Sequence, residues 1–102
     1  MTAALVWCPY PDAESARAAA GVLLDEGLIA CANILGSIES HFVWEGARAT
    51  GSEVAVLFKT TPERFDNVVE RLGELHPYDT PAIIGWHADA VHPATSVWFS
   101  VN

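Results

Sequence analysis

Short apolar segments alternate along this chain with segments whose apolar residues recur at helical spacing. Residues 3–8 form an apolar run without charge, which is typical of a central strand covered on both faces. Pro9 and Pro11 follow, and we expect them to end this strand. In residues 12–26, apolar side chains recur every three or four positions, with Asp12 as the N-cap and a glycine just beyond the end. This pattern predicts the first helix.

The middle of the chain is predicted to form a long β-hairpin. Residues 28–45 are strand-like throughout, with Gly36 and Ser37 as a bend or bulge. Residues 52–60 form a second, nearly all-apolar strand, which is typical of a central position in a sheet. We expect residues 46–51, which begin and end with glycine, to form the turn.

The last part of the chain predicts a second helix, a last strand and a short terminal helix. Residues 62–75 place proline in a first helical turn and then carry a continuous apolar stripe. Residues 81–86 are predicted to be a strand, and residues 93–99 a brief helix.

The order β-α-β-β-α-β predicts an α+β fold of ferredoxin-like topology. Right-handed crossovers give an antiparallel sheet with both helices on one face. The second strand is then an edge, and its length and apolar character would promote aggregation unless another subunit covered it.

Composition supports one domain over residues 1–102 with apolar surface left over. Half of the residues (51%) are hydrophobic, four are Trp and only 18% are charged, which is low for a monomer. We therefore expect part of the apolar surface to lie in an interface between subunits.

Charge and cysteine content restrict the partners and the compartment. The formal net charge is −8, and the five basic residues stand singly along the chain, which argues against a nucleic acid or an anionic membrane as partner. Residues 1–6 lack the features of a secretory signal, and no apolar run is long enough to span a membrane. We predict a cytoplasmic protein in which Cys8 and Cys31 are free thiols.

Candidate chemistry is limited to a thiol and an imidazole. The fold could bring Cys8, at the end of the first strand, close to His76, which follows the second helix, and this pair would suit Cu(I) or Zn(II). The structural alternative is that Cys8 is a core residue and that His76 forms hydrogen bonds. Trp7-Cys8-Pro9-Tyr10 also matches part of a glutaredoxin redox motif, but Pro11 replaces the resolving thiol. No residue pattern indicates catalysis, and we predict that the protein is not an enzyme.

Several short motifs occur in the order and near the spacing of one known family. They are Cys8 with Pro11-Asp12, Ile29-Ala30-Cys31-Ala32-Asn33-Ile34, Trp44-Glu45-Gly46, Ser52-Glu53-Val54 leading to Lys59-Thr60, and His76-Pro77-Tyr78-x-x-Pro81. Taken together, they resemble the CutA family of divalent-cation tolerance proteins from Leu5 to Trp98.

The resemblance implies a tight homotrimer in which the long hairpin strands pair between subunits. It also implies a role in tolerance or homeostasis of copper or another divalent metal, which would be bound weakly. The metal ligands proposed for the family fall on Cys8 and His76 in this sequence.

A second function follows from the likeness of the CutA trimer to PII signalling proteins. In that case a small ligand or a partner protein would bind in clefts between subunits, near Trp44, Glu45, Lys59 and Tyr78. The sequence leaves both functions open.

This chain also departs from the CutA pattern. Phe42 stands where the family has Tyr, Ala47 where it has Lys, and Ala82 where it commonly has Glu. Near the C-terminus, Thr95-Ser96-Val97-Trp98 replaces Tyr-Leu-x-Trp. The first three changes remove polar groups from the region where a site would be assembled.

Overall fold

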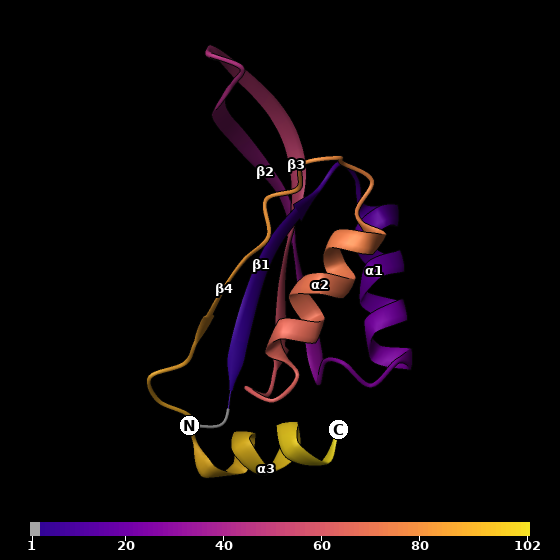
Figure 1. The fold of residues 1–102 in the computed structure, drawn as a ribbon, viewed down its shortest axis with the longest axis vertical. Coiled ribbons are helices and arrows are strands. Elements are labelled where there is room, and N and C mark those ends of the chain that lie inside the picture. Colours follow the sequence, from indigo (N-terminus) through magenta and orange to yellow (C-terminus); the bar gives the residue numbers. More distant parts are fainter. Residues whose placement is uncertain (1–2) are drawn as a thin grey trace.

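A four-stranded antiparallel sheet organises residues 3–102, the part of the chain that the computed structural model describes (Figure 1). The strands lie in the order β2-β3-β1-β4, so β2 and β4 are the edges, and the ferredoxin-like prediction is confirmed. The elements follow one another as β1 (Ala4–Tyr10), α1 (Ala13–Asp25), β2 (Cys31–Trp44), β3 (Ala47–Thr60), α2 (Phe65–Leu75), β4 (Ile84–His87) and α3 (Pro93–Val101).

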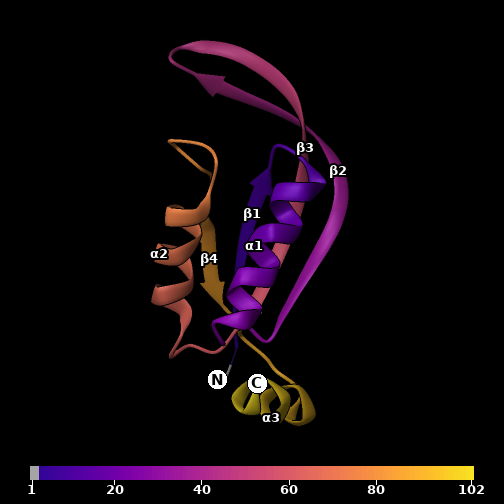
Figure 2. The ribbon, with the colours of Figure 1, turned by 90° about the vertical axis from the view of Figure 1, so that its right-hand side faces the viewer.

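The core lies between the sheet and the pair α1 and α2, which pack side by side on one face (Figure 2). Alternate residues of a strand point to the same face, and this alternation selects the buried set. The helix-facing core residues of the two central strands are Val6, Cys8, Tyr10, Val54, Val56 and Phe58. The two helices contribute Ala16, Ala20, Leu23, Val68 and Leu72.

The first helix forms as predicted, because its ends satisfy the backbone locally. The Asp12 carboxylate accepts a hydrogen bond from the backbone N–H of Ser15 at 2.7 Å. Gly27, just beyond the helix, has φ +70°, a conformation that glycine adopts without strain. The second helix starts later than predicted, at Phe65, because residues 62–64 form a turn before it.

The first strand does not stop at Pro9, as the sequence predicted, but continues to Tyr10. Neighbouring β4 is short and pairs with β1 only from Ala4 to Trp7, and the expected strand over residues 81–86 is reduced to Ile84–His87. On the β4 side of β1, Pro9 therefore has no partner strand and needs no backbone N–H, so a proline fits the strand at this point.

The hairpin turn is tighter than the predicted turn over residues 46–51. It consists of Glu45 and Gly46 alone, with φ +51° and +81°, as in the two-residue turns that match the twist of a hairpin. β3 therefore begins at Ala47. The predicted bulge is confirmed by a register shift between Ile34 and Gly36. The resulting ribbon rises past the ends of both helices, along the 44 Å axis of the molecule (Figure 1).

The C-terminal helix α3 lies across the end of the sheet that is far from the hairpin turn (Figures 1 and 2). It is attached through the buried Phe99 and through Arg64, whose guanidinium donates to the backbone carbonyls of Phe99 and Asn102 at 3.5 and 3.0 Å. Within residues 3–102, none of the helices is long and apolar enough to cross a membrane.

Packing between β4 and α2 leaves no room for a side chain at Gly85. A Cβ atom there would lie 2.5 Å from Cε1 of Phe65 and 2.9 Å from the carbonyl oxygen of Leu5. We expect Gly85→Ala to lower the free energy of unfolding by about 1–3 kcal/mol, because the Phe65 ring must move. Urea denaturation at one fixed protein concentration measures this change.

The matched control is Gly73→Ala on the exposed side of α2, where a Cβ meets nothing within 4 Å. Alanine in a helix is favoured over glycine, so this variant is expected to gain up to about 1 kcal/mol. Equal stability of Gly85→Ala and the wild type would contradict the tight contact between β4 and α2.

Candidate functional site

The two candidate ligands, Cys8 and His76, meet at the backbone carbonyl of Pro9. Cys8 lies on β1, and His76 directly follows α2. The Nε2–H of His76 donates a hydrogen bond to the Pro9 oxygen at 2.7 Å, and the Cys8 sulfur lies 3.9 Å from the same oxygen. The tertiary structure therefore brings the two side chains together, although they are far apart in the sequence.

Both ring nitrogens of His76 have partners within the chain. Nε2 donates to Pro9, and Nδ1 accepts a hydrogen bond from the backbone N–H of Tyr78 at 3.1 Å. These two bonds define a neutral tautomer. The ring is buried and stacks on Tyr10, with centroids 4.5 Å apart and planes 21° apart. His76 thus fixes the path of the chain where it leaves α2.

The Cys8 thiol is fully buried and remains protonated at neutral pH. Burial raises the pKa of Cys8 to about 11; the charge of Glu53 acts in the same direction and the Tyr10 hydroxyl in the opposite one. A redox or nucleophilic cysteine needs a lowered pKa, so this environment does not favour redox chemistry at Cys8.

Tyr10 and Glu53 belong to the same cluster, and sequence reasoning named both only within motifs, without a role in the site. The Tyr10 hydroxyl is buried near Cys8, without a hydrogen bond of normal geometry, and its pKa is raised mainly by burial. The Tyr78 hydroxyl donates to the Glu53 carboxylate at 3.2 Å, and the pKa of Tyr78 is raised by partial burial and then by that carboxylate. The spacing of Cys8 and Tyr10, two apart on one strand, was a signal that they share a face.

The cluster does not fit a resident metal ion. A ligand must be deprotonated and free to bind, whereas Cys8 holds its proton to high pH and His76 uses both nitrogens in hydrogen bonds. Among residues 3–102, no group of three or more His, Cys, Asp or Glu side chains is placed to hold a metal. Ligation by Cys8 and His76 stays a prediction, and the structure gives both residues a structural role.

The four residues of the predicted ligand cleft are spread over the chain. Trp44 and Glu45 lie at the hairpin turn, whereas Lys59 lies near the opposite end of β3, where it pairs with Leu5 and Cys31. Tyr78 lies in the loop after α2. One chain does not bring them into a common cleft, so a cleft that includes them requires neighbouring subunits.

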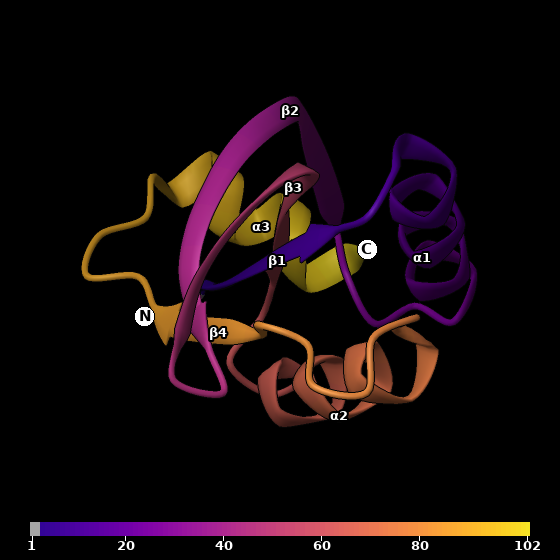
Figure 3. The ribbon, with the colours of Figure 1, turned by 90° about the horizontal axis from the view of Figure 1, so that it is seen from above.

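The face of the sheet opposite α1 and α2 carries large apolar side chains. Trp7 on β1 lies between Leu57 of β3 and Ile84 of β4, and Leu5 lies opposite Trp86. Ile84 and Trp86 are 62% and 47% exposed. Seen from above, α1 and α2 lie on one side of the row of strands, and only α3, across the far end, approaches the other side (Figure 3). We call this surface the open face.

The hairpin continues the open face. Along β3, Ala47 and Ala49 are in phase with Leu57, and their partners on β2 are Trp44 and Phe42. Trp44 and Phe42 are about half exposed. Exposed apolar surface of this extent marks an interaction site on a protein that dissolves in water.

Comparison with known proteins agrees with the fold and the motifs. A family model described as the CutA1 divalent ion tolerance protein matches residues 4–102. The chain belongs to the CutA1 family. The divalent-cation tolerance protein CutA of Thermococcus kodakarensis is 38% identical over 100 residues, which cover 98% of this chain and 95% of that protein. The protein of the same description from Pyrococcus horikoshii is 40% identical over 94 residues, 92% of this chain and 91% of its own.

A solved CutA1 structure confirms the architecture. The crystal structure of the divalent ion tolerance protein CutA1 from Ehrlichia chaffeensis superposes with a TM-score of 0.92 at 33% identity and covers 97% of this chain and 92% of that one. CutA1 proteins are described by ion tolerance and not by an enzymatic activity.

Two departures from the CutA pattern enlarge the open face of this CutA1 chain. Phe42 lies opposite Ala49, and Ala47 lies opposite Trp44, so all four side chains point to the apolar side of the hairpin. Replacing the family's Tyr and Lys by Phe and Ala removes polar groups from this side, which makes it better suited to burial against another protein.

The raised pKa of Cys8 predicts a loss of stability at alkaline pH. The folded-state pKa, about 11, exceeds the ordinary value of 9.0, so the stabilisation is complete below pH 9 and is lost as the pH rises through 11. We expect Cys8 to account for a loss of roughly 1–3 kcal/mol over this range. Urea unfolding of the wild type and of Cys8→Ala at pH 8, 9.5 and 10.5 measures it.

Cys8→Ala should show a shallower fall with pH than the wild type, whereas Cys31→Ser, which changes the half-buried thiol on β2, should keep the wild-type slope. Identical slopes for all three proteins would show that the Cys8 thiol does not couple to folding.

Proposed function

We propose that this protein acts in divalent-cation tolerance as a homotrimer that assembles through its open face and its hairpin. Membership in the CutA1 family supports the role in tolerance. The observation that carries the assembly is the continuous apolar surface from Trp86 and Ile84 through Trp7 to Phe42 and Trp44, which lies opposite α1 and α2 and stays largely exposed at Ile84, Trp86, Phe42 and Trp44.

The two sheet edges support the same proposal. β2 is an edge strand of 14 residues, and within residues 3–102 its outer backbone N–H and C=O groups face no other strand. A long uncovered edge readily pairs with a strand of another chain. β4 leaves a second, shorter edge on the opposite side of the sheet. Pairing between copies would satisfy these backbone groups and bury the open face at once.

Charge opposes the assembly and makes it dependent on salt. Each chain carries a formal net charge of −8, so copies repel one another. Burial of aromatic and aliphatic area must outweigh this repulsion. Because salt screens charges on the surface, the proposed trimer should become more stable as ionic strength rises.

The proposed ions are copper or another divalent metal, bound weakly and in exchange with solution. Weak binding is expected because, among residues 3–102, no group of three or more His, Cys, Asp or Glu side chains is placed to hold an ion. We place the protein in the cytoplasm, where its two free thiols would stay reduced. The PII-like alternative shares the assembly and stays a prediction.

Removing apolar area from the open face should break up the assembly. Three copies of the 11.0 kDa chain give about 33 kDa in light scattering. Trp86→Glu and Phe42→Glu each place a charge in the proposed interface and should shift the mass towards 11.0 kDa. Leu24→Glu is the matched control, because Leu24 is 49% exposed on α1, away from the open face. A wild type that runs as a monomer would overturn the assembly.

Equilibrium dialysis with Cu(I) and Zn(II) tests the binding of ions. We expect the wild type to take up ions and expect Cys8→Ser and His76→Ala to take up nearly as much at neutral pH, because neither side chain is a free ligand. A large loss in both variants would instead establish the ligand pair that the family resemblance implies. No uptake by the wild type would count against direct binding of ions.

A further inference from the structure

The hairpin has a polar side that is opposite to its apolar one. Glu39 lies directly across from Ser52, and His41 directly across from Thr50. Directly opposed residues of an antiparallel pair point to the same side, and residues two apart on one strand do so as well. The four side chains therefore form one group, whereas the neighbouring Phe42 points to the apolar side.

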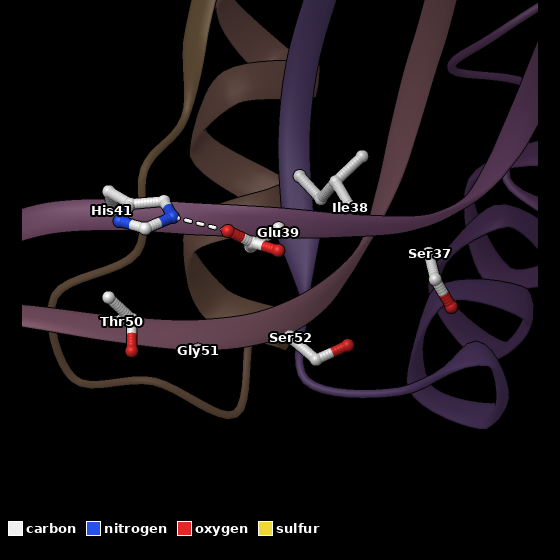
Figure 4. A pocket seen from close by; sticks show the side chains of 7 residues that line it. All are labelled: Ser37, Ile38, Glu39, His41, Thr50, Gly51 and Ser52. Carbon is white, nitrogen blue, oxygen red and sulfur yellow. Dashed lines mark hydrogen bonds and ion pairs between the residues drawn. The ribbon is translucent and has the colours of Figure 1, made fainter.

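The ligand-type atoms of His41 and Glu39 converge. Nε2 of His41 lies 2.5 Å from Oε2 of Glu39, and the two side chains point toward one another along β2 (Figure 4). They stand at a groove of about 530 Å³, which is also lined by Ser37, Ile38, Thr50, Gly51 and Ser52. Both side chains are largely open to solvent, with 57% and 81% of their surface exposed.

We propose that His41 and Glu39 form a binding site for a borderline divalent ion such as Zn(II) or Cu(II). The ion would be held by the imidazole Nε2 and the carboxylate, and water would fill its other positions. An imidazole and a carboxylate are donors that these ions accept. This inference rests on the proposed role in cation tolerance and assigns His41 and Glu39 as the residues that bind the cation.

The geometry requires little rearrangement. An ion about 2.1 Å from each donor separates the nitrogen and oxygen by about 3.0 Å in square-planar and about 3.4 Å in tetrahedral geometry, so the present pair must open by less than about 1 Å around it. Thr50 and Ser52 lie directly across from His41 and Glu39 on β3. In contrast to Cys8 and His76, the two donors are accessible, and the bond that the ion would replace is the one between them.

The site and the proposed subunit interface use opposite sides of one ribbon. Phe42 and Trp44 face the apolar side, which assembly buries, and His41 and Glu39 face the polar side. A trimer would therefore carry three such sites.

Isothermal titration of the wild-type assembly with Zn(II) at pH 7.5 tests the site. We expect His41→Ala and Glu39→Gln each to weaken the tightest binding phase about tenfold or more, since each removes one of two ligands. Glu70→Gln, which removes a carboxylate from the exposed side of α2, is the matched control and should bind as the wild type does. Light scattering on every variant reports the oligomeric state.

A second measurement identifies the ligand. Cu(II) bound to the wild type should show nitrogen hyperfine coupling from an imidazole in its electron paramagnetic resonance spectrum, and His41→Ala should lose it.

The outcomes separate this inference from the proposed function. Equal Zn(II) affinity in the wild type, His41→Ala and Glu39→Gln would overturn the site while leaving ion binding elsewhere on the protein intact. A wild type that binds neither ion would overturn both. If His41→Ala changes the assembly, the nearly isosteric Glu39→Gln decides, and binding unchanged in that variant overturns the site.

Discussion

One face of the four-stranded sheet is buried under α1 and α2, while the other is left to Trp7, Leu57, Ile84 and Trp86. Of the helices in residues 3–102, α1 and α2 cover one face, and α3 lies across the end of the sheet. Burial of aromatic area is the strongest driving force for association that a small protein has. The proposed self-assembly would cover this exposed apolar surface, and the hairpin extends the same surface beyond the helices.

The carbonyl oxygen of Pro9 is the point at which His76 is attached to the sheet. β4 ends before it reaches Pro9, so the sheet accepts a residue that has no N–H, and the imidazole of His76 takes the place that a further strand would occupy. The same bond positions the loop that brings Tyr78 to Glu53. The cysteine beside it is sealed in the core, where burial keeps the thiol protonated. The residue types that suggested metal chemistry here act as packing and hydrogen-bonding groups.

The two sides of the β2–β3 hairpin differ in polarity. Successive side chains of a strand point to opposite sides. The two-residue turn at Glu45 and Gly46 sets the register of the hairpin, and in this register every second residue of β2 and β3 points to the apolar side. His41 and Glu39 fall on the other side with Thr50 and Ser52. A single ribbon can thus present one surface for association and another for a cation, without competition between them.

Much of the fold follows from the sequence by itself. Apolar periodicity, the Asp12 cap and the position of Gly36 determine the strands, the first helix and the bulge, because these are local preferences of the backbone. The CutA motifs, read in order, identify the family. Only the tertiary structure decides that Pro9 stays in its strand, because that depends on where β4 ends. It also decides that His76 has no free nitrogen and that Glu39 and His41 converge. The partners of His76 come from distant parts of the chain, so no spacing in the sequence predicts them, whereas for Glu39 and His41 the two-residue spacing predicts a shared side but not the contact between the two side chains.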